Sequence, residues 1–291
     1  MWQNLSSHRK GLVFVGLSAL LFSTPGLFTR GVSASGWDVI FWRALFTVMF
    51  TTAYLTWRGT LKSQISNLGI VGWANALVWA SGTIAFLQAY KLTSIANVSL
   101  VYGSAPILTA FLAWMWFRER PRNIVLAASM LAFAGVVVIG AGSLGTMHLG
   151  GDLLALWMSC TVAIGLSVFR KFPQTPAAGT ALMSSVLVIP PALIWGQPFA
   201  TSYSEIAILA LFGLVFSIAA ILLSEGSKLL PSSEAALVSN LEVPVQPILA
   251  WIILNELPTR ATFIGGALIL IAIGASTWPS RGRVATMPTI G

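Results

Sequence analysis

The sequence predicts an all-α integral membrane protein of ten transmembrane helices, arranged as two inverted repeats of five, with both termini in the cytoplasm. Three observations predict this fold. Charged residues make up 8% of the chain and hydrophobic residues 56%, whereas a typical soluble domain carries about 25% charged residues. The basic residues gather on one set of alternating loops, and the second half of the chain repeats the first.

Ten apolar segments each have roughly the 20 residues that a helix needs to cross a hydrocarbon core of about 30 Å. They cover residues 11–30, 37–57, 69–90, 95–117, 122–142, 150–170, 176–195, 205–227, 233–254 and 261–278. The remaining residues suffice only for short loops, so no soluble catalytic or nucleic-acid-binding domain fits. The first segment resembles a signal sequence, but the further spans make its cleavage irrelevant to the fold.

The basic residues report the orientation of the chain. Twelve of them lie at the termini or in even-numbered loops, three (Arg30, Lys91 and Arg260) lie in odd-numbered loops, and Arg43 lies within a span. Because cytoplasmic loops carry the excess of Lys and Arg, both termini are expected in the cytoplasm. The net charge of +8 therefore does not indicate binding of nucleic acid.

A shift of 137 residues aligns the two halves of the chain without gaps. The matched positions include residues that are not interchangeable apolar filler: Lys91 with Lys228, Trp114 with Trp251, Glu119 with Glu256, and Pro121 with Pro258. The chain is therefore expected to hold two five-helix repeats, residues 1–142 and 143–291. Because five is odd, the second repeat enters the membrane from the other side. Inverted repeats are typical of secondary transporters, with the site near the midplane at the repeat interface.

The ninth segment carries the most informative residue, Glu242. It lies about 15 Å from the start of the segment, near the midpoint of the hydrocarbon core. A carboxylate there costs about 2.5–3.5 kcal/mol, and Pro244 and Pro247, which follow it, each remove a backbone donor and are expected to open the helix. Ser239 and Gln246 share a helical face with it. Three roles stay open for Glu242: a partner for a substrate ammonium, a proton carrier, or a structural group paired with Arg43.

Other candidate site residues lie in the third, fourth and sixth segments. Asn75 and Trp79 share one face of the third segment with the aromatic Phe86, which suits either the stacking of flat substrates or simple packing. The fourth segment offers three residues at the depth of Glu242, namely Tyr102, Ser104 and Pro106. Ala105 takes the place of Glu242 in the repeat, so the site is expected to be acidic on one side only. Trp157, in the sixth segment, contacts either substrate or the core.

Arg43 has two interpretations that the sequence leaves open. It lies about 9 Å into its span, so it can extend to the external surface. It can equally bind a substrate carboxylate through its planar guanidinium.

Structural or gating roles are assigned to residues near the ends and bends of the spans. Glu119 and Glu256 fall at loop ends, where capping or gating ion pairs are expected. Prolines interrupt the spans and offer hinges, although static packing explains them too; they are Pro25, Pro106, Pro190, Pro191, Pro244 and Pro247. The fifth and tenth segments are rich in small residues and are expected to pack outside the pathway.

Together these features resemble the drug/metabolite transporter superfamily, EamA branch. The resemblance rests on Phe41-Trp42-Arg43-Ala44, on the motifs Glu119-Arg-Pro121 and Glu256-Leu-Pro258, and on the small-residue helices that follow them. Within the branch the chain is most similar to the YddG-type aromatic amino-acid exporters of bacterial inner membranes. The resemblance implies alternating access, an amino-acid substrate and lipid as partners, and no cofactor.

Other functions are less compatible with the sequence. A proton-coupled exporter of drugs or of metabolites such as nucleobases is the nearest alternative, with Glu242 as the proton carrier. An intramembrane enzyme is not favoured, because the chain has no HExxH or GxSxG motif. The lone Cys160 provides neither a disulfide nor a thiol metal site. A channel stays open because some channels have inverted repeats. A monomer is compatible with the sequence, which does not fix the oligomeric state.

Overall fold

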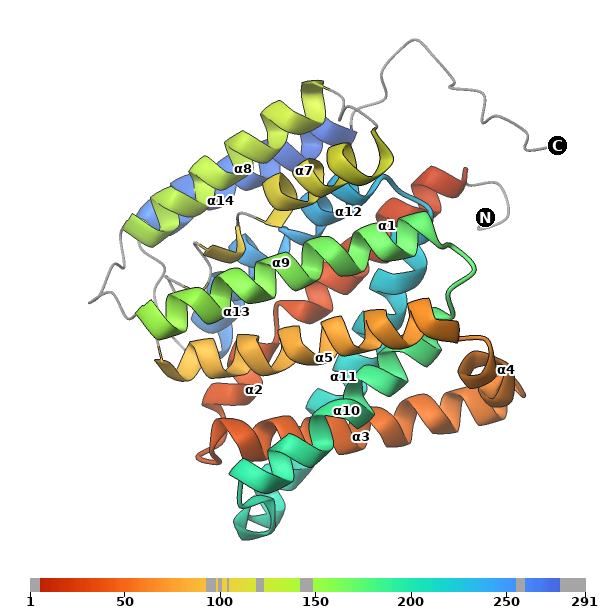
Figure 1. Ribbon diagram of the computed structural model, residues 1–291. Coiled ribbons are helices and arrows are strands. Elements are labelled where there is room, and N and C mark those ends of the chain that lie inside the picture. Colours follow the sequence, from red (N-terminus) through yellow and green to blue (C-terminus); the bar gives the residue numbers. More distant parts are fainter. Residues whose placement is uncertain are drawn as a thin grey trace, which may run out of the picture.

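The chain folds into a bundle of helices, and several of them are long enough to span a membrane (Figure 1). The structure is a computed structural model, and it describes residues 6–92, 98, 101–103, 105–118, 123–141, 149–254 and 260–277. Within these ranges there is no β-strand.

The helices of the first half of the chain are α1 (Ser7–Phe22), α2 (Pro25–Arg30), α3 (Gly36–Trp57), α4 (Leu61–Ser66), α5 (Gly69–Leu92), α7 (Ala105–Phe117) and α8 (Asn123–Ala141). Those of the second half are α9 (Leu149–Lys171), α10 (Ala177–Trp195), the 3₁₀ turn η2 (Pro198–Ala200), α11 (Tyr203–Lys228), α12 (Ser232–Ser239), α13 (Glu242–Leu254) and α14 (Arg260–Thr277).

The described apolar helices overlap the segments expected from the sequence. Among the described residues, seven stretches are long and apolar enough to cross a membrane, and α7, α8 and α14 contain shorter apolar helices. Two of the seven, Ser7–Thr29 and Ser232–Ile253, each consist of two consecutive helices separated by a break. The chain is thus a multi-pass membrane protein.

The helix boundaries repeat at the same interval as the sequence. α7 and α13 each have 13 residues, and α13 begins and ends 137 positions after α7. α8 and α14 begin at Asn123 and Arg260, again 137 positions apart. The sequence match is therefore accompanied by a match in local structure.

Corresponding helices of the two halves also make corresponding contacts. α5 packs along α9 in the way that α11 packs along α1, and α3 packs on α11 as α10 packs on α5. α8 and α14 pack against each other (Figure 1), where a Cβ added at Gly135 would lie 2.5 Å from the carbonyl oxygen of Gly265. This close contact explains the small residues in both helices.

The ninth expected span is broken one turn earlier than the prolines suggested. α12 ends at Ser239 and α13 begins at Glu242, so the break lies at residues 240–241. Pro244 lies in the first turn of α13, where a backbone N–H has no partner within the helix in any case, and α13 continues through Pro247. Pro25 and Pro106 likewise lie in the first turns of α2 and α7.

The expected interruption at Pro190 and Pro191 was wrong, because α10 runs without a break from Ala177 to Trp195. The two prolines remove backbone donors, but the helix is held on both sides of them. Val188 and Ala192 are fully buried in a cluster with residues of α3.

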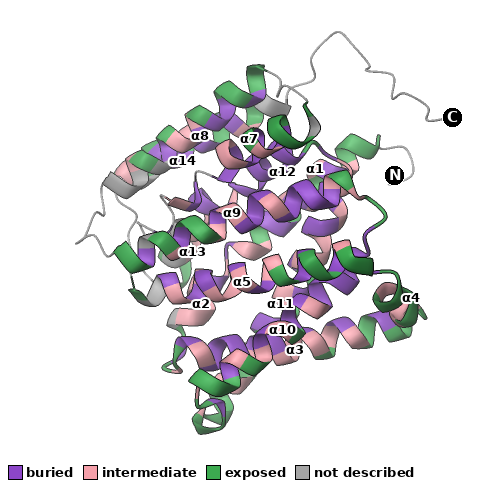
Figure 2. Ribbon diagram, in the orientation of Figure 1, coloured by how far each residue is buried: buried purple, intermediate pink, exposed green. Residues whose placement is uncertain are grey.

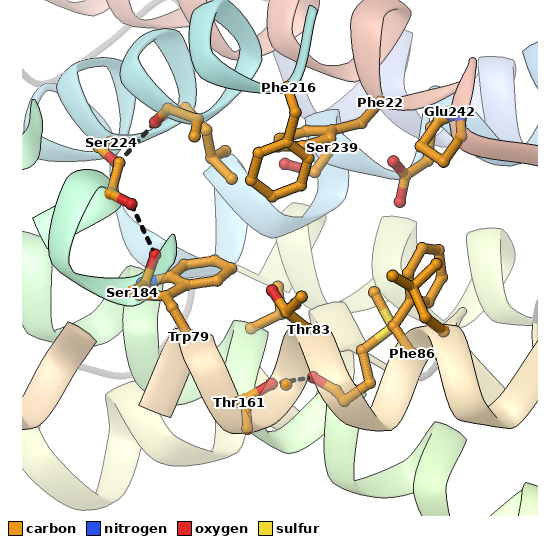
Figure 3. Close-up of a pocket in the computed structure, with 18 of the residues that line it drawn as sticks. Phe22, Trp79, Thr83, Phe86, Thr161, Ser184, Phe216, Ser224, Ser239 and Glu242 are labelled. Atoms are coloured by element: carbon orange, nitrogen blue, oxygen red, sulfur yellow. Dashed lines mark hydrogen bonds between the residues drawn. The ribbon is translucent and has the colours of Figure 1, made fainter. Parts of the chain in front are cut away.

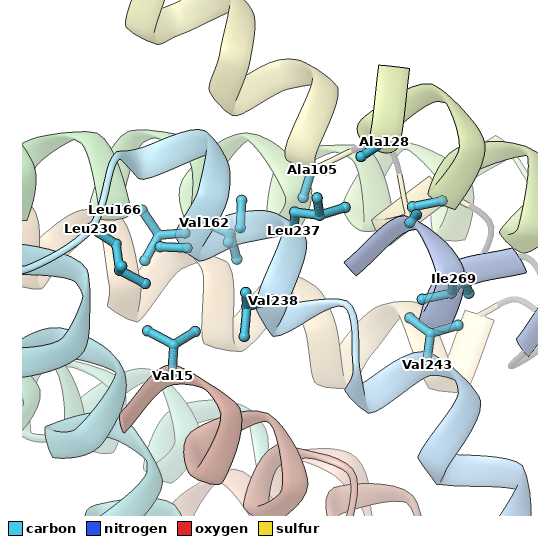
Figure 4. Packing of buried hydrophobic residues seen from close by; sticks show 14 of the residues in the cluster. Val15, Ala105, Ala128, Val162, Leu166, Leu230, Leu237, Val238, Val243 and Ile269 are labelled. Carbon is cyan, nitrogen blue, oxygen red and sulfur yellow. The ribbon is translucent and has the colours of Figure 1, made fainter. Parts of the chain in front are cut away.

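The largest apolar core joins α1, α7, α8, α9, α11, α12, α13 and α14 (Figure 4). α12 lies at its centre, and all eight residues of α12 are buried (Figure 2). Val15 and Leu166 pack on one side of it, and Ile269 packs near Val243, just beyond the break. This core therefore holds the broken span in place and fixes the position of Glu242.

Candidate functional site

A cavity of about 1040 Å³, part of it open to the exterior, lies between the two halves of the chain. Its wall is built by α1, α2, α3, α5, α9, α10, α11, α12 and α13, together with Tyr102. Among the described residues, none from α8 or α14 lines the cavity, as expected for helices that pack outside the pathway.

Glu242 enters the cavity wall because of the break in its span. It is the first residue of α13, directly after the break, and its side chain is 7% exposed. The hydroxyl of Tyr102 hydrogen-bonds to its carboxyl group. The carboxyl group points into the space that Thr83 and Phe86 border from the opposite side (Figure 3). A carboxylate at a helix N-terminus is also favoured by the helix dipole.

Arg43 lies in the wall of the same cavity and is only 1% exposed, so it does not extend to the external surface. Its Cζ lies 3.9 Å from the ring centroid of Phe216 and 5.8 Å from that of Phe212. A cation over an aromatic face is stabilised by the ring quadrupole. Within the described part of the chain, no hydrogen-bond partner reaches its Nε or Nη1. The cavity therefore holds a buried cation with unused N–H groups.

Arg43 and Glu242 do not form an ion pair with each other in this structure. The first comes from α3 in the first half of the chain and the second from α13 in the second half. A buried charge without an opposite charge beside it costs several kcal/mol. Two such charges of opposite sign on one cavity wall form a site that a ligand with both charges would complete.

Aromatic rings form the walls between these polar groups. Trp79 and Phe86 of α5 lie opposite Phe22 and Phe216 across the cavity (Figure 3). The indole of Trp79 is held from behind by Gly165, because a Cβ added there would lie 2.5 Å from its Cε2. Such walls favour flat apolar groups.

The wall repeats across the two halves of the chain. Fourteen lining residues form seven pairs that are 137 positions apart: Pro25 and Val162, Arg43 and Thr180, Trp79 and Phe216, Thr83 and Ala220, Phe86 and Leu223, Leu87 and Ser224, and Tyr102 and Ser239. The cavity thus lies where the repeats face each other. The two charges break this symmetry, since Thr180 corresponds to Arg43 and Ala105 to Glu242.

The structure brings only part of the expected site together. The candidates that line the cavity are Arg43, Trp79, Tyr102, Ser239 and Glu242. Gln246 is partly exposed and is not a lining residue, and Pro106 and Pro244 are buried beside the wall without lining it. The candidates Ser104, Glu119 and Glu256 lie outside the described residues.

Two further candidates lie away from the cavity. Trp157 is 48% exposed on the outside of α9, and its Nε1 donates to Ser81 Oγ over 3.2 Å. Its expected contact with substrate is therefore not supported by its position. Asn75 is 1% exposed but is packed behind the wall, where its side-chain atoms have no partner among the described residues.

Several lining residues were not expected from the sequence. They include aromatic rings and hydroxyl groups on α1, α9, α10 and α11: Phe22, Thr161, Phe169, Thr180, Ser184, Phe212, Phe216 and Ser224. The repeat carries a signal for one of the aromatic rings, because Phe216 corresponds to Trp79. The hydroxyl groups carry none, since serine and threonine are common in membrane helices that bind nothing.

Comparison with known proteins gives consistent matches across the chain. Solute carrier family 35 member G1 of Homo sapiens is 22% identical over 290 residues, which cover 91% of this chain and 78% of that protein. An uncharacterized transporter of Haemophilus influenzae is 26% identical and covers 94% of this chain and 97% of its own length. YwfM of Bacillus subtilis, also an uncharacterized transporter, is 25% identical over 221 residues (71% of this chain and 74% of that protein).

A solved crystal structure of a protein has the same fold, with a TM-score of 0.80 at 20% identity, covering 92% of this chain and 96% of that chain. The model of the EamA-like transporter family matches the chain twice, at residues 9–141 and 149–278. The EamA branch expected from the sequence is thereby confirmed. Since the two matches together span nearly all of the sequence, the chain belongs to the EamA-like transporter family.

Proposed function

We propose that this chain is a secondary transporter that exports neutral amino acids, above all aromatic ones, by alternating access. The observation that carries the proposal is the presence of Arg43 and Glu242, unpaired with each other, in the wall of one buried aromatic cavity. An α-amino acid carries a carboxylate and an ammonium group on one carbon. Such a metabolite supplies a partner for each of the two charges at once.

The two charges suit the two ends of the zwitterion. Arg43 lines the cavity, and its Nε and Nη1 are buried without a hydrogen-bond partner among the described residues. A planar guanidinium binds a carboxylate through two parallel hydrogen bonds. The carboxylate of Glu242 accepts from an ammonium group. Trp79 and Phe216 then border the space available to an aromatic side chain.

The proposed topology has ten spans in two inverted repeats, residues 1–142 and 143–291, with both termini in the cytoplasm of a bacterial cell and the protein in its inner membrane. The repeat of helix bounds at 137 positions and the bacterial transporters among the relatives support it. Alternating access requires that the halves exchange roles about the site. The paired cavity walls are consistent with such an exchange.

One alternative has a specific observation in its favour. Glu242 is the only carboxylate among the described lining residues, which is what a proton-coupled exporter of drugs or nucleobases would need. In that case the substrate binds the aromatic walls, and Glu242 exchanges a proton with the solution instead of binding an ammonium group.

Counterflow in proteoliposomes tests the proposal without presuming an ion gradient. Vesicles loaded with unlabelled L-tryptophan should accumulate labelled L-tryptophan. Tryptamine lacks the carboxylate and indole-3-propionate lacks the ammonium group, so each should compete at least about tenfold more weakly than tryptophan, since a charged hydrogen bond contributes about 1.5–3 kcal/mol. If both analogues compete as well as tryptophan, recognition of the zwitterion is wrong. Uptake that requires a pH gradient would favour the alternative.

A further inference from the structure

The end of the cavity away from Glu242 carries hydroxyl groups. Ser184 of α10 and Ser224 of α11 lie at one end, and Glu242 lies at the other (Figure 3). Thr180, one turn before Ser184, also lines the cavity. Ser184 is 8% exposed and Ser224 is 6% exposed. A ligand group that contacts these serines is therefore shielded from water.

The protons of these hydroxyl groups are already committed to the helix backbone. Ser184 Oγ donates to the carbonyl of Ala181 over 2.8 Å, and Ser224 Oγ donates to that of Ala220 over 2.7 Å. A hydroxyl group has one proton to donate and two lone pairs to accept with. Toward the cavity, both serines therefore present acceptors.

The side-chain N–H group of Trp79 does not add a hydrogen-bond donor at this end of the cavity. Trp79 Nε1 is buried and points at α9, since a Cβ added at Gly165 would lie 2.6 Å from it. The indole thus presents carbon atoms to the cavity. A ligand atom at this end meets oxygen lone pairs and carbon.

Glu242, the proposed partner of the ammonium group, lies away from these serines (Figure 3). Arg43 lies against Phe216, and Phe216 and Trp79 separate the two serines from Glu242 (Figure 3). An amino acid whose head is held by Arg43 and Glu242 directs its side chain between Trp79 and Phe216. The far edge of an aromatic ring then approaches Ser184 and Ser224.

We propose that Ser184 and Ser224 select side chains whose far edge carries a hydrogen-bond donor, the indole N–H or the phenol O–H, over a plain phenyl ring. This inference rests on the proposed amino-acid function. A donor at the far edge satisfies the lone pairs that lose water when the ligand binds, whereas a phenyl edge leaves them unsatisfied. A site built to hydrogen-bond a substrate group rejects the analogue that lacks it.

Two matched ligand pairs test this inference without any mutation. In the counterflow assay with labelled L-tryptophan, unlabelled tryptophan should compete about tenfold better than 1-methyltryptophan, and tyrosine about tenfold better than phenylalanine, since 1.4 kcal/mol is tenfold. The donor ligand is the smaller member of the first pair and the larger member of the second. Ligand size therefore cannot produce both preferences.

The variant Ser184→Ala/Ser224→Ala should lose both preferences, so that the two members of each ligand pair compete about equally well. Ser129→Ala is the matched control, because Ser129 Oγ makes the same kind of bond, 2.8 Å to the carbonyl of Val125, on α8 outside the cavity. Equal competition within both ligand pairs, in a protein that exchanges amino acids, overturns the inference alone. The absence of exchange for every amino acid instead overturns the proposed function.

Discussion

Gly165 of α9 and Trp79 of α5 are packed so closely that a Cβ at position 165 would lie 2.5 Å from the indole. The Gly165→Ala variant must therefore push the indole toward the cavity. Overpacking of this kind costs about 1–3 kcal/mol, and we expect a loss of tryptophan affinity of roughly tenfold. Competition in counterflow measures it. Gly16→Ala is the control, since nothing lies within 4 Å of a Cβ there, and an equal loss in both variants would contradict the prediction.

Trp79→Ala should impair the transport of aromatic substrates more than that of small ones. Stacking against the indole contributes about 0.5–1.5 kcal/mol beyond the buried area, and only a substrate with a ring gains it. Initial rates for tryptophan and alanine, measured in the same vesicles, give the ratio. A similar loss for both substrates would point to damage of the fold or the transport cycle.

Glu242→Gln keeps the shape of the side chain and removes its charge. If Glu242 binds the substrate ammonium group, as proposed, tryptophan affinity should fall by roughly tenfold to a hundredfold. Glu225→Gln is the control, since Glu225 pairs with Lys228 at 3.2 Å and does not line the cavity.

The same Glu242→Gln variant separates the remaining roles of this residue. A proton carrier would still exchange substrate for substrate but lose its response to a pH gradient. A structural group would leave both transport modes intact, because an amide is cheaper to bury than a charge. Full counterflow activity in a well-folded Glu242→Gln protein would exclude Glu242 as a binding residue.

Arg43→Lys keeps the charge but loses the planar fork of N–H groups, so it should weaken tryptophan binding less than Arg43→Met does. In the Arg43→Met variant the carboxylate of the substrate has no partner. Tryptamine should then compete as well as tryptophan, and this loss of selectivity is not expected from general misfolding. If tryptamine stays the weaker competitor in Arg43→Met, the carboxylate binds elsewhere.

The topology makes a prediction that does not depend on the substrate. In a Cys160→Ser background, single cysteines at residues 58–64 and 281–285 should both be shielded from a membrane-impermeant thiol reagent in intact cells. Thr201→Cys, in a predicted external loop, should react under the same conditions. If labelling places residues 58–64 and 281–285 on opposite sides of the membrane, the proposed topology of two five-helix repeats is wrong.

Most of the fold could be predicted from the sequence, because the strongest patterns in the sequence reflect physical requirements of the membrane. Apolar length located the spans, and the 137-residue repeat located corresponding positions such as Ala105 and Glu242, where α7 and α13 both begin. The presence of a break in the ninth span could be inferred from Pro244 and Pro247. Its position before Glu242 could not, since a proline fits within the first turn of a helix as well as at its end.

The site was harder to predict from the sequence than the fold. A membrane helix is apolar on every side, so its sequence does not show which side faces the cavity. Trp157 and Trp79 are both tryptophans in the middle of a span, yet only Trp79 lines the cavity. Ser184 and Ser224 look like any serine that bonds to its own helix. Glu242 was accessible because a carboxylate at the midplane has few tolerable surroundings.

The seven pairs of corresponding lining residues have a consequence for how a ligand travels. If the two halves were identical, the cavity would accept a ligand in two opposed poses. Arg43 corresponds to Thr180, and Glu242 corresponds to Ala105, so each charge lies in one half only. The two charges therefore select one of the two poses. In the proposed topology α11 ends at the cytoplasm, and Ser224 lies four residues before Lys228, the last residue of that helix. In the proposed transport cycle, an amino acid seated with its ring toward Ser224 therefore enters head first from the cytoplasm and departs head first to the outside, without turning round.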